Sequence, residues 1–222
     1  MIPLRASERL QSATPVTASI IALNVMVFLY QFALPQYALG QFVDRWGVVP
    51  DRINSHLIAL LTSMFLHAGW THLLGNMLFL WVFGRPIENL IGRERFFGFY
   101  ILCGVAAAIV HVVSNPYSPI PTIGASGAIA GVMGAYLIKF PKSYIDTLVW
   151  FIFLSRIEIP APYFLIYWFV IQLFSGVGSI SEVDYTGGGV AWFAHIGGFL
   201  AGMGLIYLFR TKPRWRAWYE ED

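Results

Sequence analysis

Residues 187–209 read GGGVAWFAHIGGFLAGMGLIYLF. A helix needs about 20 predominantly apolar residues to cross a bilayer, and this run meets that length. It contains one histidine, His195, seven residues after Gly188, which places the imidazole roughly 10 Å along a helix that starts at the glycines. Ionisable side chains at membrane depth are costly and usually functional. The stretch therefore predicts a membrane-spanning helix with a functional histidine near one end.

The rest of the chain has the composition of a membrane protein. Of its 222 residues, 57% are hydrophobic and only 12% are charged, too few charges to cover the surface of a soluble domain of this size. We therefore expect an all-α, polytopic membrane protein with a six-helix bundle: a short tail at 1–15, a membrane domain at 16–209 and a tail at 210–222. The first apolar run is longer than a signal-peptide core, so we expect it to be retained. The six expected spans are residues 16–34, 70–91, 96–113, 125–140, 163–176 and 187–209.

Basic residues indicate how these spans are oriented, because cytoplasmic loops are enriched in Lys and Arg. With six spans both termini lie on one side, together with twelve of the 14 Lys and Arg residues. We therefore expect both termini in the cytoplasm, and the compact six-span form favours a bacterial inner membrane. The net charge of +2 predicts no nucleic-acid partner. The twelve residues are Arg5, Arg9, Arg85, Arg93, Arg95, Lys139, Lys142, Arg156, Arg210, Lys212, Arg214 and Arg216, and the other two are Arg45 and Arg52.

Three of the expected spans carry polar side chains near the same end. Span 70–91 has His72 and Asn76, span 125–140 begins near Ser126, and span 187–209 has His195. The proline-broken, nearly charge-free loop at 114–123 is expected to descend to the depth of Ser126. A serine hydroxyl is a weak nucleophile that needs an adjacent base, and a neutral imidazole supplies one. We interpret Ser126 and His195 as a catalytic dyad, because no span supplies a well-placed Asp or Glu as a third member.

His72 and Asn76 are four residues apart, so both side chains lie on one face of a helix. Their ring N–H and amide N–H are donors of the kind that stabilises a developing oxyanion. The first backbone amides of the helix that carries Ser126 have no partner within that helix and point the same way. We therefore predict oxyanion stabilisation by His72 and Asn76.

Glycines line one face of two of the expected spans. Gly198 and Gly202 form a small-xxx-small pair on the sixth span, and Gly127, Gly131 and Gly134 line a similar face on the fourth. Such faces let two membrane helices approach closely. If the two faces meet, the sixth-span histidine, which lies one turn outward of Gly198, is beside the start of the fourth span.

Each feature also has an ordinary structural explanation. An isolated serine at a helix start is more often an N-cap, an isolated buried histidine is more often a satisfied core residue, and a His–Asn pair can be an interhelical hydrogen bond. Glycine pairs in membrane helices mostly serve packing. The convergence of three groups at one depth favours catalysis. We predict no metal site and an inert thiol at Cys103. We expect structural or interfacial roles for His56, His67 and His111, and interhelical hydrogen bonds for Asn24 and Gln172.

The three motifs together resemble those of the rhomboid family of intramembrane serine proteases, over most of residues 57–209. Residues 67–76, HAGWTHLLGN, are similar to the family's second-span motif. Residues 124–127, GASG, with Gly124 and Gly127 around the serine, are similar to its Gly-x-Ser-Gly. Residues 194–198, AHIGG, followed by Gly202, are similar to its sixth-span motif.

The resemblance implies a role for each motif residue. Ser126 takes the role of the nucleophile and His195 that of the base, while His72 and Asn76 stabilise the oxyanion. Glu88 stands where the family often has a glutamate that holds the loop between the first two spans.

Two positions depart from the family's pattern. Ala130 stands where some members have a tyrosine that packs on the catalytic histidine, so an aromatic cover for His195 must come from elsewhere. Ile58 and Ala59 replace a Trp-Arg pair in the loop before the second span. Neither departure removes a reacting group.

The expected function is therefore that of an intramembrane serine endopeptidase without a cofactor. It would cut single-span or other membrane proteins in or near their transmembrane segments, and substrates would reach Ser126 past the short span 163–176. One alternative is a catalytically inactive rhomboid-like protein that binds membrane clients. Another is a small transporter, which the absence of internal repeats disfavours.

Overall fold

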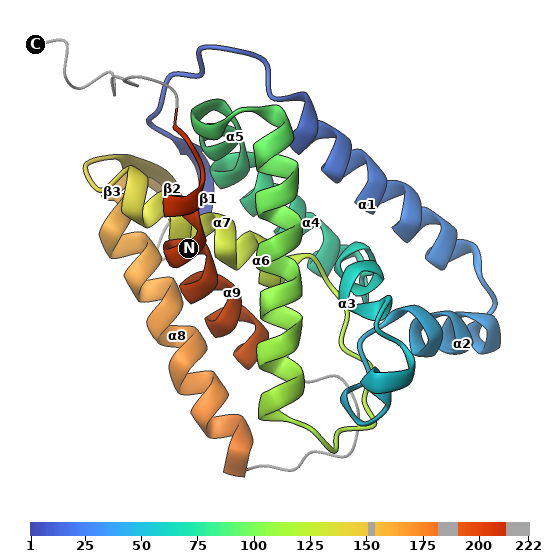
Figure 1. The fold of residues 1–222 in the computed structure, drawn as a ribbon. Coiled ribbons are helices and arrows are strands. Elements are labelled where there is room, and N and C mark those ends of the chain that lie inside the picture. The colour runs from blue at the N-terminus through green and yellow to red at the C-terminus, as the bar shows by residue number, and fades with distance from the viewer. Residues whose placement is uncertain (151–153, 182–190, 212–222) are drawn as a thin grey trace, which may run out of the picture.

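The computed structural model describes residues 1–150, 154–181 and 191–211 (Figure 1). Most of these residues are helical, and a helix overlaps each of the six expected spans. Residues 187–190 of the sixth expected span and residues 212–222 of the expected C-terminal tail lie outside the described residues. The helices are α1 (Pro15–Ala33), α2 (Gln36–Trp46), α3 (Ala59–Thr62), α4 (Trp70–Phe79), α5 (Arg85–Ile91), α6 (Arg93–Ser114), α7 (Ser126–Lys139), α8 (Ala161–Ser181) and α9 (Trp192–Leu205), with the short helical turns η1 (Pro50–Ser55), η2 (Ser63–Phe65), η3 (Leu80–Gly84) and η4 (Ile206–Leu208).

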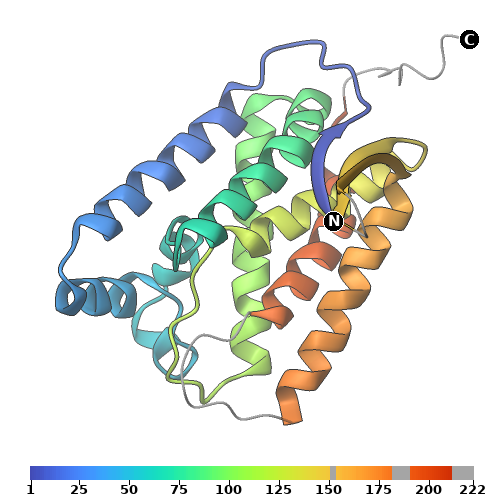
Figure 2. The same ribbon diagram turned by 180° about the vertical axis from the view of Figure 1, so that it is seen from behind.

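Helix α7 is the central element of the bundle. It packs along α9, and α6 packs against both. Helices α1 and α8 flank the bundle on opposite sides in both views (Figure 1 and Figure 2). Every residue of α7 from Gly127 to Tyr136 is buried. The fold therefore places Ser126 at the N-terminal end of a helix that is buried along most of its length.

Two of the described helices are long and apolar enough to cross a membrane by themselves. These are α1 and α6. Helix α7, the described apolar part of α8 and the α9–η4 segment are apolar but shorter. The six-span count therefore stays a prediction, although the helices it rests on are present.

The central helices meet backbone to backbone. A Cβ added to Gly202 would overlap the carbonyl oxygen of Gly131, and one added to Gly198 would overlap that of Gly127. Toward α6, a Cβ on Gly131 would lie 2.5 Å from the Cβ of Cys103. Glycine costs about 1 kcal/mol relative to alanine within a helix. Here it permits an approach that no other residue allows, and this approach sets the distance between the first turns of α7 and α9.

The expectation of an all-α fold is only partly confirmed, because the structure also contains a small β-sheet. Strands β1 (Ile2–Ala6), β2 (Tyr144–Trp150) and β3 (Leu154–Pro160) form an antiparallel sheet in the order β1-β2-β3. Ile145 and Thr147 of β2 are buried, which is the alternation of a strand with one covered face. The protein is thus mostly helical, with a small sheet made of the two strands between α7 and α8 and of the N-terminal strand. In the register, Leu148 pairs with Ile2 and Arg156, and Ile145 pairs with Ala6 and Ile159.

The segment before α1 is tied to α5 rather than free. The Glu88 carboxylate accepts hydrogen bonds from the backbone N–H of Val16 at 3.0 Å and from the backbone N–H and hydroxyl of Thr17 at 2.7 Å each. Asn89 Oδ1 accepts from the backbone N–H of Gln11 at 3.1 Å. The expectation that Glu88 holds the loop between the first two spans is therefore wrong, because its carboxylate caps the first turn of α1.

Glu8 predicts a pH dependence of stability. Its carboxyl is buried and accepts a hydrogen bond from the Tyr136 hydroxyl of α7. Burial raises the pKa of Glu8 from 4.5 to about 7, although the Tyr136 bond acts in the opposite direction. The native state therefore holds the proton more tightly than the unfolded chain. The contribution is fully present below about pH 4.5 and is lost as the pH rises through 7, at a cost on the order of 3 kcal/mol.

Thermal unfolding of the detergent-solubilised protein between pH 4.5 and 8 tests this. Replacement of Glu8 by Gln removes the titrating group, so the variant should lose less stability than the wild type over this range. Parallel unfolding curves for the two proteins would show that Glu8 does not titrate in this way.

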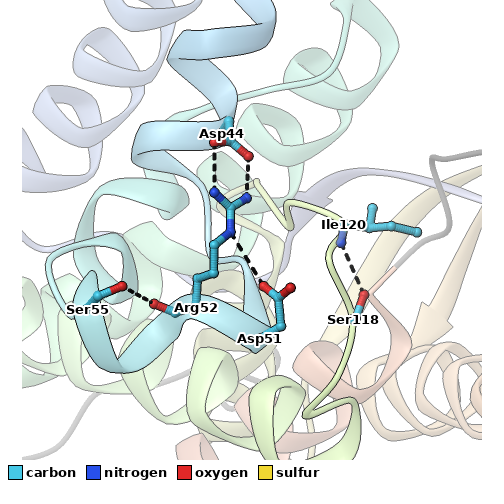
Figure 3. A network of polar contacts seen from close by, with 6 residues as sticks. All are labelled: Asp44, Asp51, Arg52, Ser55, Ser118 and Ile120. Atoms are coloured by element: carbon cyan, nitrogen blue, oxygen red, sulfur yellow. Dashed lines mark hydrogen bonds and ion pairs between the residues drawn. The ribbon is translucent and has the colours of Figure 1, made fainter.

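The segment after α2 is bonded both to α2 and to the loop that precedes α7. Arg52 of η1 donates to both carboxylate oxygens of Asp44 on α2, at 2.5 and 3.1 Å (Figure 3). This hydrogen-bonded ion pair holds the pKa of the Asp44 carboxyl below its ordinary value. Val48 and Thr122 exchange two backbone hydrogen bonds of 3.0 and 2.7 Å. The bridge fixes the loop that enters α7 against the loop that leaves α2.

Candidate active site

Ser126 and His195 are in hydrogen-bond contact. The Ser126 hydroxyl on α7 lies 2.7 Å from Nε2 of His195 on α9. His195 is buried and Ser126 is partly exposed. The two residues are 69 positions apart in the sequence, and the glycine contacts between α7 and α9 bring them together. A hydroxyl bonded to a neutral imidazole is the arrangement from which serine acts as a nucleophile.

Helix α8 and the first residue of α9 supply further contacts of the imidazole. Nδ1 of His195 lies 2.6 Å from Oε1 of Gln172. The ring of Trp168 lies 5.8 Å from the imidazole at 40°, and the ring of Trp192 lies 6.2 Å from it at 90°. The aromatic cover that Ala130 cannot provide therefore comes from these two tryptophans.

His72 turns one ring nitrogen toward the start of α7. Its Nδ1 accepts a hydrogen bond from the backbone N–H of Ala68 at 3.4 Å, so in the neutral ring the hydrogen is on Nε2. That Nε2 lies against Gly124, where an added Cβ would be only 2.8 Å away. An N–H donor is thus directed at the segment that immediately precedes Ser126.

Asn76 lies on the same side of Gly124. Its Nδ2 would be 3.7 Å from a Cβ added to Gly124, and it is 3.0 Å from Nε2 of His67. Because an amide nitrogen only donates, His67 accepts one hydrogen and the other remains for a second acceptor. The His67 backbone N–H donates to Gln31 Oε1 at 3.0 Å, and Gln31 Nε2 donates to the His67 carbonyl at 3.3 Å. The α1 glutamine thereby positions the histidine that positions Asn76.

Gly124 adopts a backbone conformation that favours glycine. Its φ is +129°, and its N–H donates to the Ser63 carbonyl at 2.9 Å. A side chain there would be strained by this φ and would strike the His72 ring. The glycine therefore lets the imidazole approach the turn that leads into Ser126.

A small cavity lies beside the nucleophile. Its volume is about 30 Å³, and its lining includes Ser63, Ser126, Thr122 and His111. Thr122 Oγ1 lies 2.8 Å from His111 Nε2. The rest of the lining is mostly apolar, but a cavity of this size with these polar groups in its wall has room for a water molecule.

Of the four side chains predicted to form the site, the structure brings Ser126 and His195 into contact and places His72 and Asn76 beside Gly124, two residues before Ser126. Gln172 is expected to make an interhelical hydrogen bond, and it does so from α8 to His195 on α9. His67, expected in a structural or interfacial role, contacts Asn76. The only signal for Gln172 was a polar side chain within an apolar span, and its partner depends on how α8 is rotated.

Comparisons with known proteins agree with this architecture. The Rhomboid domain family matches residues 54–212. The putative rhomboid protease YdcA of Bacillus subtilis is 35% identical over 124 residues, which are 55% of this chain and 61% of that protein. Rhomboid protein 1, mitochondrial, of Saccharomyces cerevisiae is 27% identical over 201 residues, 85% of this chain and 51% of that protein. Rhomboid protease GluP of Bacillus subtilis is 44% identical over 78 residues, 35% of this chain and 15% of that protein.

The matched regions thus cover less than two thirds of each of these three relatives. The Rhomboid match, in contrast, extends over more than half of this chain and includes α4, α7 and α9, the three helices that carry the clustered polar residues. The chain therefore belongs to the rhomboid family, whose members are integral membrane proteins.

Proposed function

We propose that this protein is an intramembrane serine endopeptidase that hydrolyses peptide bonds in or near the transmembrane segments of other membrane proteins. The observation that carries the proposal is the 2.7 Å contact between the Ser126 hydroxyl and His195 Nε2. A packing role for either residue does not require this contact. The membership of the family and the names of two relatives as rhomboid proteases add support.

In the first half of the reaction, Ser126 Oγ attacks the scissile carbonyl carbon and His195 Nε2 takes the hydroxyl proton. The carbonyl oxygen becomes an oxyanion, for which His72 Nε2–H, Asn76 Nδ2–H and the first amides of α7 are the available donors. His195 then returns the proton to the leaving amine, and an acyl ester on Ser126 remains.

In the second half, water attacks the ester carbonyl while His195 takes a proton from that water. The oxyanion forms at the same donors, collapses to the carboxylic acid product and releases Ser126 with its hydroxyl proton restored. The cavity beside Ser126 offers a place from which such a water is supplied.

The proposed topology in the membrane determines which substrates can reach Ser126. Six spans with both termini in the cytoplasm account for the distribution of Lys and Arg, and a bacterial inner membrane fits this form. Ser126 can attack only extended backbone, because a helix hides its carbonyl groups. The substrates are therefore expected to be transmembrane segments that unwind easily, with small residues at the cut, and to arrive past α8.

Cleavage in proteoliposomes tests the function. The purified protein is reconstituted with a panel of single-span substrates that carry small and helix-destabilising residues in the span, and the products are identified by mass spectrometry. We expect cuts within or beside the spans, and none with Ser126→Ala. Equal cleavage by that variant would contradict the proposal.

The oxyanion donors make a separate prediction. Asn76→Ala removes one donor and leaves the Ser126–His195 contact in place, so turnover should fall by about 10²–10³-fold. His72→Ala should lower it to a similar extent. Initial rates on one substrate measure the effect, with Asn54→Ala in the exposed η1 turn as a matched control that should leave the rate unchanged. A normal rate in Asn76→Ala would remove that residue from the mechanism.

The alternative is a rhomboid-like protein that binds membrane clients without cutting them. It predicts client capture that survives Ser126→Ala and no reaction of Ser126 with a serine-directed probe. The contact between a hydroxyl and an imidazole favours the enzyme.

A further inference from the structure

Gln172 is the inward-facing residue of its part of α8. Its side chain is 6% exposed, whereas those of Leu173 and Phe174 next to it are 38% and 76% exposed. The two polar atoms of its amide have separate partners. Nε2 donates to the carbonyl of Trp168 one turn earlier at 3.4 Å, and Oε1 lies 2.6 Å from His195 Nδ1.

These contacts fix which nitrogen of His195 carries the hydrogen. An amide oxygen only accepts, so the 2.6 Å contact requires a hydrogen on Nδ1. In the neutral ring Nε2 then has a lone pair, and this lone pair faces the Ser126 hydroxyl. The other tautomer would set the Nδ1 lone pair against the Gln172 oxygen and turn an N–H toward Ser126 Oγ. Only the first tautomer can take the proton of the nucleophile.

We propose that Gln172 is a positioning residue of the catalytic site, which holds His195 in the tautomer and orientation required of a base. The proposal rests on the proposed function. Gln172 does not touch the reacting atoms and acts through the imidazole alone. The expected unit is therefore a Ser126–His195 pair with a neutral third member from α8, where sequence reasoning expected a dyad.

The third member belongs to a helix other than the two that carry the reacting pair. The tilted ring of Trp168 lies 5.8 Å from the imidazole and Gln172 binds its Nδ1, so two side chains of α8 contact the ring. Helix α8 is itself held on α9 by the stacked rings of Phe169 and Phe199, 4.6 Å apart at 26°. The tautomer and orientation of His195 therefore depend on how α8 packs against α9.

Two variants of Gln172 test the role. Gln172→Met keeps the length of the side chain and removes the acceptor. Gln172→Leu also removes the acceptor but has a shorter side chain. The rate of fluorophosphonate labelling of Ser126 and kcat should fall by about 10- to 100-fold, while KM changes little. Gln41→Met, the same replacement at an exposed glutamine of α2, should change neither value.

The tautomer supplies a readout that a merely structural role would not move. In histidine-labelled protein, ¹⁵N shifts distinguish a hydrogen on Nδ1 from one on Nε2, and His195→Ala identifies the signals of His195. The wild type should show the Nδ1–H form, and Gln172→Met should show a mixture. Labelling at the wild-type rate with an unchanged Nδ1–H signal in Gln172→Met would overturn the proposal.

A double-mutant cycle tests the dependence on α8. Phe169→Ala removes the ring stack between α8 and α9 without changing His195 itself. In an otherwise wild-type protein it should slow the fluorophosphonate labelling of Ser126. The same change should have a smaller effect in Gln172→Met, because the contact through which α8 acts is already lost. Equal effects in both backgrounds would contradict this dependence. A wild type that is not labelled at all would instead overturn the proposed function.

Discussion

Ser126→Ala should reduce proteolysis by roughly 10⁴–10⁶-fold, because it removes the atom that attacks the substrate. His195→Ala should cost a similar factor, since it removes the base that the hydroxyl contacts. The double variant should be no worse than either single one, because the two residues act as one unit. Product release from one proteoliposome substrate measures all three rates.

The control for this series is folding. Ser126 is partly exposed at the mouth of α7 and loses only one hydroxyl in the alanine variant, so thermal unfolding should change little. Independent, multiplying losses in the double variant would show that Ser126 and His195 do not function as a pair.

Gly202→Ala should be among the most damaging single-methyl changes in the chain. The added Cβ would overlap the Gly131 carbonyl oxygen, so α7 and α9 must separate. Overpacking of this kind typically costs about 1–3 kcal/mol. The separation also stretches the Ser126–His195 contact, because the same two helices carry that pair. Stability and catalysis should therefore fall together.

Gly204→Ala is the matched control in the same helix. A Cβ at Gly204 would meet no atom within 4 Å, so the change should be neutral or slightly stabilising through helix propensity. Thermal unfolding and the cleavage rate of the two variants make the comparison. Equal behaviour would mean that the close approach of α7 and α9 is not what holds the site together.

The positions of the helices could be predicted from the sequence because each helix in the bundle corresponds to an apolar run. A helix overlaps each of the six expected spans, although within the described part of the chain only α1 and α6 are long and apolar enough to cross a membrane by length and composition. The sheet could not be read in the same way. Strand β1 pairs with β2 across more than 130 residues, and such a pairing leaves no local trace in a polar N-terminal segment.

Contacts of the site could be predicted where the spacing within one motif sets the direction of the side chains. They could not be predicted where the rotation of a helix about its axis determines which residue faces the site. His72 and Asn76 share a helical face at any rotation of α4, so their common direction follows from an interval of four residues. Gln172 contacts His195 only because α8 presents that position to α9. Glu88 caps α1 because the chain before α1 folds back on α5, which no spacing predicts.

The most direct test of the central claim is fluorophosphonate labelling of the purified protein, followed by peptide mass spectrometry. Ser126 Oγ displaces fluoride from phosphorus and His195 takes its proton, so the account predicts one label on each chain, at Ser126. The label should be absent from Ser126→Ala and nearly absent from His195→Ala. A folded protein that stays unlabelled, or that is labelled equally well without His195, would contradict the account.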